Sequence, residues 1–266
     1  MIFVLGGFWL HPLTFVLAGL VILAGTQYEY LIMIRNTGVK PQLVPGMITG
    51  TASYMLATLI AAGILPVKFF LVLIPVMLFI MIVELYRRQE KPFDSLAHTF
   101  FSVLYTGIPL SMFPFAAFSR SGLDSILPHR LEMFSPGIII GFFLLIWAND
   151  TGAYLAGVSF GKHKLFERIS PKKTWEGFFG GVLLVVIVAW LLSSWLGVVG
   201  RTQWIIIALI VSVAGTYGDL IESMLKRSLG VKDSGNIMPG HGGFLDRFDS
   251  AIISFPLVYL FIALFG

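Results

Sequence analysis

Residues 177–198 read GFFGGVLLVVIVAWLLSSWLGV and contain no charged side chain. As an α-helix that rises 1.5 Å per residue, this stretch would be about 33 Å long, enough to cross the roughly 30 Å hydrocarbon core of a bilayer. An uncharged apolar run of this length is typical of a transmembrane helix. The stretch therefore predicts an integral membrane protein.

The composition of the whole chain agrees with this prediction. Of its 266 residues, 57% are apolar or aromatic and only 12% are charged, against about 25% charged residues in an ordinary soluble domain. The mean hydropathy is +0.88, which excludes a soluble globular protein. The chain has no cysteine, which excludes disulfides, thiolate metal sites and a cysteine nucleophile.

Apolar runs bounded by proline, glycine or charged residues predict eight full transmembrane helices. They cover about residues 13–34, 43–62, 67–86, 96–118, 134–158, 177–198, 203–225 and 250–266. Before them, Met1 to Leu10 would form a short ninth membrane helix, a half-span or an interfacial segment, and His11-Pro12 ends it. No basic residue precedes Arg35, so we expect this segment to be retained rather than cleaved as a signal peptide. The predicted fold is all-α, a polytopic domain of eight to nine helices.

Lys and Arg are divided unevenly between alternate loops, fourteen in one set and four in the other. The first set is Arg35, Lys40, Arg87, Arg88, Lys91, Lys162, Lys164, Arg168, Lys172, Lys173, Lys226, Arg227, Lys232 and Arg247. The second is Lys68, Arg120, Arg130 and Arg201. Because cytoplasmic loops carry the positive excess, we expect the first set to face the cytoplasm.

Half of all charged residues lie in two of these cytoplasmic segments, 159–176 and 219–249. Ionisable side chains inside spans are costly, so each is a candidate functional residue. The acids in or near spans are Glu29, Glu84, Asp150, Asp219 and Glu222. Glu84 is explained by its proximity to the interface and to Arg87, and Glu29 by a hydrogen bond to a neighbouring helix.

Asp219, Glu222 and Lys226 recur at spacings of three and four, which places them on one helical face with Ser223 beside them. Two glycines just upstream would let another helix, a ligand or a metal approach. Asp219 and Asp150 would lie about 10–13 Å below the helix ends. Two carboxylates at similar depth indicate one polar cavity open to the cytoplasm; the alternative is a structural polar pair between helices.

The segment that follows combines glycines, cations and acids. Glycines let backbone N–H groups face an anion, and Arg and Lys can hold phosphate oxygens. Asp246 and Asp249 would share one face at the start of the last helix. Carboxylates beside cations suit a phosphate site that also holds a hard divalent ion, because Mg²⁺ takes oxygen ligands and bridges to phosphates.

The other charged segment contains Ser170-Pro171, a pattern typical of a helix N-terminus. Lys172 and Lys173 would then lie in the first helical turn, where cations are unfavourable. A bound phosphate would resolve that conflict. The alternative is a basic loop that sets topology near anionic lipid head groups.

Three motifs resemble those of the phosphatidate cytidylyltransferases, also called CDP-diacylglycerol synthases. The longest is Ser223-x-x-Lys226-Arg227-x4-Lys232-Asp233-x-Gly235-x3-Pro239-x-His241-Gly242-Gly243-x-x-Asp246-Arg247-x-Asp249. The others are Asp150-Thr151-Gly152-Ala153-Tyr154 and Ser170-Pro171-Lys172-Lys173-Thr174-x-Glu176-Gly177. The resemblance covers roughly residues 145–255. It implies one membrane domain with hydrophobic spans in 1–130 and a catalytic region in 134–266.

This resemblance implies that the chain transfers a cytidylyl group from CTP to phosphatidic acid, giving CDP-diacylglycerol and pyrophosphate for phospholipid biosynthesis, with Mg²⁺ as cofactor. It implies a multi-pass protein of a bacterial-type inner membrane, with its active site facing the cytoplasm. It further implies a homodimer, and no nucleic acid is expected as a partner.

The matched motifs also imply site residues. The implied metal ligands are Asp219, Glu222, Asp246 and Asp249. The implied catalytic residues are Asp219, Lys226, Arg227, Lys232, His241, Asp246 and Arg247. The implied substrate-binding residues are Asp150, Lys172, Lys173, Ser223, Lys226, Arg227, Lys232, Gly242 and Gly243. In this scheme the cations hold phosphates, and His241 hydrogen-bonds a phosphate or the leaving group.

Other classes remain open at this point. The intramembrane acids would also suit an ion-coupled transporter, although such a protein needs charges reaching both sides and the outward loops hold few acids. A lipid phosphotransferase resembling polyprenol or dolichol kinases would likewise combine membrane acids with a nucleotide. A membrane assembly subunit whose charges only bind lipid head groups is a further alternative.

Overall fold

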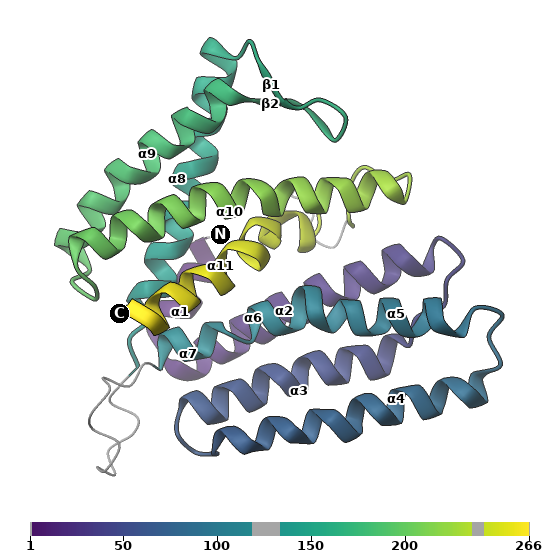
Figure 1. Cartoon of the computed structure of the whole chain (residues 1–266). Helices are drawn as coiled ribbons and strands as arrows, with labels where there is room; N and C mark the ends of the chain where they lie inside the picture. The colour runs from purple at the N-terminus through teal and green to yellow at the C-terminus, as the bar shows by residue number, and fades with distance from the viewer. Residues whose placement is uncertain (1, 119–133, 236–241, 266) are drawn as a thin grey trace. The chain divides into compact units, whose positions relative to one another are not determined.

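The structure is a computed structural model that describes residues 2–118, 134–235 and 242–265. Among these residues, eight helices are long and apolar enough to cross a membrane (Figure 1). They are Pro12–Arg35, Leu43–Ala61, Val67–Arg87, Pro92–Ala117, Gly137–Phe160, Trp175–Trp195, Arg201–Ser228 and Leu245–Phe265. The eight predicted spans are therefore confirmed, and the chain is a multi-pass, essentially all-α membrane protein.

The chain divides into two compact units. The first consists of Met1–Pro136 and Asp233–Arg247, and the second of Gly137–Lys232 and Phe248–Gly266. The expectation of one membrane domain with hydrophobic spans in 1–130 and a catalytic region in 134–266 stays a prediction.

The first unit is built from helices that pack on α2 and α3. Its elements are α1 (Ile2–Leu10), α2 (Pro12–Arg35), α3 (Leu43–Ala61), the 3-10 helix η1 (Val67–Val72), α4 (Leu73–Arg87), α5 (Pro92–Ser102), the π-helical turn η2 (Val103–Gly107), α6 (Ile108–Leu110) and α7 (Phe113–Ala117). Figure 1 shows α2, α3, α4 and α5 running side by side, and α3 contacts the other three. Phe15, Leu31 and Tyr54 are fully buried in this core.

Helix α1 ends where the sequence predicts. Pro12 occupies the first turn of α2, and the His11 Nδ1 accepts a hydrogen bond from the Leu13 N–H at 3.1 Å. Helix α1 packs on α2 through Phe8 and Phe15, whose ring centroids lie 5.0 Å apart. A helix of nine residues is about 14 Å long, about half of the hydrocarbon core.

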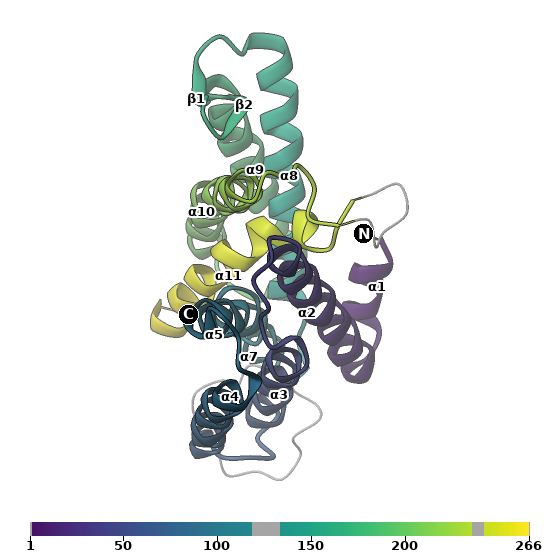
Figure 2. The ribbon, with the colours of Figure 1, turned by 90° about the vertical axis from the view of Figure 1, so that its right-hand side faces the viewer.

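The second unit contains the longest span of the described residues, Arg201–Ser228, with 28 residues. Its elements are α8 (Gly137–Phe160), β1 (Lys164–Phe166), β2 (Ser170–Thr174), α9 (Trp175–Trp195), α10 (Arg201–Ser228) and, from Phe248 on, α11 (Leu245–Phe265). The β1–β2 hairpin connects α8 to α9 and lies at their shared end (Figure 2). A Cβ on Gly152 would come within 2.7 Å of the Gly180 carbonyl oxygen, so small residues let α8 and α9 pack almost backbone to backbone.

The hairpin corrects one prediction. Ser170 does not cap a helix, because Ser170–Thr174 forms β2, which pairs antiparallel with β1. Helix α9 begins at Trp175, and the Thr174 hydroxyl accepts the Gly177 N–H at 3.1 Å as its N-cap. The N-cap rule thus applies four residues later, where the acidic Glu176 in the first turn suits the positive helix end. Lys172 and Lys173 therefore lie on β2 and not in the first turn of a helix.

Candidate active site

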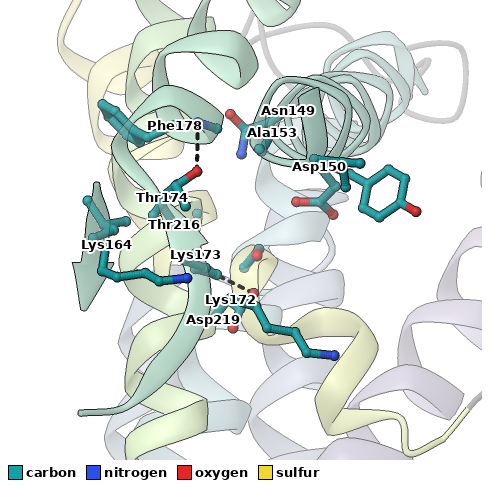
Figure 3. Close-up of a pocket in the computed structure, with 17 residues that line it drawn as sticks. Asn149, Asp150, Ala153, Lys164, Lys172, Lys173, Thr174, Phe178, Thr216 and Asp219 are labelled. Atoms are coloured by element: carbon teal, nitrogen blue, oxygen red, sulfur yellow. Dashed lines mark hydrogen bonds and ion pairs between the residues drawn. The ribbon is translucent and has the colours of Figure 1, made fainter. Parts of the chain in front are cut away.

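A cavity of about 550 Å³ lies within the second unit, lined by α8, the hairpin, α9, α10 and the start of α11 (Figure 3). Its polar and charged lining residues are Asn149, Asp150, Tyr154, Lys164, Lys172, Lys173, Thr174, Thr216, Asp219 and Ser250. The prediction that Asp150 and Asp219 face one cavity is therefore confirmed. The alternative of an isolated structural pair does not account for the lysines around them.

Lys173 and Asp219 form the central ion pair of this cavity. The Lys173 Nζ lies 2.8 Å from the Asp219 Oδ2, and the side chains are 26% and 38% exposed (Figure 3). The Ser223 hydroxyl donates to the Asp219 Oδ1 at 3.2 Å. Because both charged groups remain partly exposed, a ligand can reach them without unfolding the site.

Asp249 adds a third carboxylate in this unit. It is 8% exposed, accepts the Ser250 N–H, and interacts electrostatically with Asp219, Asp150 and Lys173. Asp249 on α11 is thus within electrostatic reach of one carboxylate on α8, one on α10 and the Lys173 ammonium. Oxygen donors of this kind suit a hard divalent cation.

Two glycines bring α11 close to α10. A Cβ on Gly218 would lie 2.7 Å from the Asp249 carbonyl oxygen and 3.0 Å from the Ser250 Cα, and one on Gly215 would lie 3.6 Å from the Ser250 Cβ. Larger residues would push the helices apart. The expectation that Gly215 and Gly218 let another helix approach is confirmed, and that approach positions Asp249.

The hairpin supplies the positive charge. Lys164, Lys172 and Lys173 reach the cavity from β1 and β2 (Figure 3). Its end is tied to α9 by Glu176, whose carboxylate lies 2.6 Å from the His163 Nδ1 and accepts the His163 N–H. Since Glu176 makes these contacts, we assign it the role of holding the hairpin in place.

Sequence reasoning missed several lining residues. From the sequence, Lys164 contributes only to the count of basic residues that predicts membrane topology. In the structure it pairs with Thr174 across the hairpin and lines the cavity. Asn149 and Thr216 are uncharged, so neither stood out; the Asn149 Oδ1 accepts the Ser212 hydroxyl at 2.7 Å. Recognising the hairpin would have identified Lys164 as a site residue.

Glu222 and Lys226 form a separate pair on α10. Their Oε2 and Nζ atoms are 2.6 Å apart, and Glu222 is fully buried. Among the described residues that line the cavity, neither Glu222 nor Lys226 appears. Of the acids expected on one face, Asp219 thus reaches the cavity, whereas Glu222 is covered by Lys226. Its role as a metal ligand remains a prediction.

Glu29 holds the described residues of the longest motif that belong to the first unit. The Glu29 Oε2 accepts the Ser234 hydroxyl at 3.0 Å and the Leu245 N–H at 2.8 Å. The Asp246 Oδ2 accepts the Ser234 N–H and the Gly243 N–H at 3.1 Å, and it lies 3.0 Å from the Ser234 hydroxyl, whose single hydrogen it shares with Glu29. The expected hydrogen bond from Glu29 to a neighbouring helix is confirmed, because Leu245 begins α11.

The remaining predicted residues are placed as follows. Arg227, Lys232 and Arg247 are exposed, and Gly242 has a φ of +80°, a left-handed conformation that glycine adopts easily. His241 lies outside the described residues. Because Gly242, Gly243, Asp246 and Arg247 belong to the first unit, their part in a site with Asp219 remains a prediction.

These features define a class, a multi-pass membrane protein with a charged cavity among its helices. The chain matches the Cytidylyltransferase family over residues 1–265 and belongs to that family. The resemblance in its motifs is thereby confirmed.

Individual relatives carry a more specific name. The chain is 44% identical over 139 residues to a phosphatidate cytidylyltransferase of Bacillus subtilis (strain 168), covering 52% of each protein. It is 41% identical over 172 residues to one of Staphylococcus epidermidis, covering 61% of this chain and 66% of the relative. It is 50% identical over 122 residues to one of Staphylococcus aureus (strain COL), covering 45% and 46%. The chain thus spans about half to two thirds of the length of these relatives.

Proposed function

We propose that the protein transfers a cytidylyl group from CTP to phosphatidic acid, giving CDP-diacylglycerol and pyrophosphate for phospholipid biosynthesis. The observation that carries this proposal is the cavity in which Lys164, Lys172 and Lys173 meet Asp150 and Asp219. Cations for phosphate oxygens and acids for a metal, within a bundle of membrane helices, suit a nucleotide and a lipid phosphate together.

The reaction needs positioning more than proton transfer. An oxygen of the lipid phosphate attacks the α-phosphorus of CTP, a new P–O bond forms, and the bond from that phosphorus to the bridging oxygen of the leaving pyrophosphate breaks. The attacking oxygen is already anionic near neutral pH, so no strong base is required. Catalysis then consists of in-line orientation and neutralisation of negative charge.

In this proposal the hairpin lysines bind the phosphates. Lys173 already contacts Asp219, so its ammonium is held in the cavity where a phosphate would arrive. Lys164 and Lys172 are exposed, so they can contact the other phosphate groups of a triphosphate. Lys226, Arg227, Lys232 and Arg247 complete the predicted phosphate contacts.

The donor chemistry of the cavity fits Mg²⁺. Within the described ranges no cluster of three His, Cys, Asp or Glu side chains forms a metal site. Mg²⁺, however, is commonly held by one or two carboxylates plus substrate phosphates and waters. Asp219 and Asp249 would hold it in this unit. When bound, Mg²⁺ neutralises charge on the α-phosphate and on pyrophosphate.

The proposed orientation places the cavity on the cytoplasmic side of a bacterial-type inner membrane. It is supported by the excess of Lys and Arg in the loops that include the hairpin. CTP is available on that side, and the lipid phosphate lies at head-group depth. The homodimer implied by the resemblance remains a prediction.

Purified protein supplied with phosphatidic acid, Mg²⁺ and CTP labelled at either the α- or the γ-phosphate tests the proposal. We expect α-label in the extractable lipid and release of pyrophosphate. Label from the γ-phosphate in lipid would instead indicate a lipid kinase. Ion or solute flux across liposomes without pyrophosphate release would indicate a transporter.

A further inference from the structure

A second charged cavity, of about 350 Å³, lies within the first unit. It is formed by the end of α2, the loop before α3, the first turn of α3 and the end of α4. Arg35, Lys40 and Arg87 line it. None of its residues belongs to the motifs on which the proposed reaction depends.

The wall of this cavity is fixed by buried hydrogen bonds. Gln42, 3% exposed, donates from Nε2 to the Glu84 Oε2 at 2.6 Å and to the Ile80 carbonyl oxygen at 2.9 Å. The Arg87 Nη1 lies 2.7 Å from the same Glu84 oxygen, and its Nη2 donates to the Lys40 carbonyl oxygen at 3.0 Å. The loop is therefore held in place, and Glu84 balances the charge of Arg87.

The other two cations are not balanced in this way. Arg35 and Lys40 are exposed, and in the described part of the chain neither forms an ion pair. The cavity therefore carries an excess of two positive charges. The first turn of α3, at Leu43 and Val44, adds the positive end of a helix of 19 residues. Together these groups favour a phosphate.

An apolar surface continues from the same cavity. Val44, which lines it, is 61% exposed, and Ile48, one turn further along α3, is 58% exposed. Residues four apart share one face of a helix, so an acyl chain can lie along both side chains. A free phosphate ion would make no use of this surface, which favours a lipid as the occupant.

We propose that this cavity binds the head group of an anionic phospholipid, with Arg35 and Lys40 contacting its phosphate and an acyl chain lying along Val44 and Ile48. Basic pockets between membrane helices bind anionic head groups in this manner. None of its residues lines the cavity assigned to CTP and phosphatidic acid, and its existence does not depend on the proposed reaction.

Native mass spectrometry of the delipidated full-length chain, titrated with phosphatidylglycerol or phosphatidylcholine, tests this proposal. The test variant is Arg35→Gln/Lys40→Gln. The matched control is Arg88→Gln/Lys91→Gln, which removes two exposed cations of the same unit that do not line the cavity. At about 1 kcal/mol per cation, the test variant should bind phosphatidylglycerol roughly 30-fold more weakly. The control should bind it like the original chain.

Three results would overturn the proposal: unchanged binding in the test variant, equal losses in both variants, or equal affinity for both lipids. Millimolar inorganic phosphate that displaces the lipid head group and binds equally well alone would show a free-phosphate site instead. Thermal unfolding of each variant verifies folding. Should the double variant not fold, Lys40→Gln alone, in an exposed loop position, should weaken binding about 5-fold, and no weakening would refute the site.

Discussion

Replacing Glu29 by Gln should loosen the segment that carries the signature residues. The carboxylate of Glu29, 2% exposed, accepts the Ser234 hydroxyl and the Leu245 N–H through one oxygen. Hydrogen bonds to a charged acceptor contribute about 1.5–3 kcal/mol each, against about 0.5–1.5 kcal/mol for neutral ones. Asp246 also accepts the Ser234 hydroxyl, so part of that loss is compensated.

We therefore expect Glu29→Gln to cost about 1–2 kcal/mol of local stability, and Glu29→Ala about 2–4 kcal/mol. Hydrogen exchange of peptides covering 242–250, measured by mass spectrometry, reports this directly. A loss of 1–2 kcal/mol corresponds to roughly 5- to 30-fold faster exchange at the Leu245 amide.

The matched control is Glu90→Gln, which removes an exposed carboxylate of the same unit and should change stability by no more than about 0.5 kcal/mol. The reasoning is refuted if exchange around Leu245 is the same in Glu29→Gln as in the original chain. It is equally refuted if Glu90→Gln accelerates that exchange to the same extent.

Three further predictions concern the active-site unit. Asp219→Asn should abolish incorporation of α-label into lipid without changing thermal unfolding. Chelation with EDTA should abolish the same incorporation until Mg²⁺ is restored. Full activity of the variant at limiting Mg²⁺ would contradict the metal assignment. Lys173→Ala should lower kcat/KM for CTP at least about 10-fold, whereas a defect only in membrane insertion would support a topological role. Gly218→Ala should destabilise the protein by about 1–3 kcal/mol, because its Cβ would meet the Asp249 carbonyl oxygen at 2.7 Å. Gly6→Ala, whose Cβ would meet nothing within 4 Å, should leave the melting temperature unchanged.

The spans could be predicted from the sequence because the bilayer imposes one simple requirement, a long and predominantly apolar helix. The shared cavity of Asp150 and Asp219 could also be predicted, since ionised acids within spans need a polar environment. The β1–β2 hairpin could not be predicted. Its strands contain three and five residues and show no hydrophobic alternation, and Ser170-Pro171 has the pattern of a helix start.

Contacts between distant parts of the sequence could not be predicted either. Glu29 and Ser234 are 205 positions apart, and nothing in either local pattern links them. Ser234 and Leu245 both donate hydrogen bonds to Glu29, and both belong to the same unit as the N-terminal spans. A carboxylate placed among apolar residues indicates that a partner exists, but it does not identify the partner.

The ion pair between Lys173 and Asp219 links the binding of anions and cations. In the proposed reaction, a phosphate that drew the Lys173 ammonium away would leave the Asp219 carboxylate without its countercharge, and a metal ion bound at that carboxylate would likewise release the ammonium. Because coupling free energies between sites are reciprocal, each ligand raises the affinity for the other by the same factor. Nucleotide and metal should therefore bind this cavity cooperatively, with each alone binding weakly.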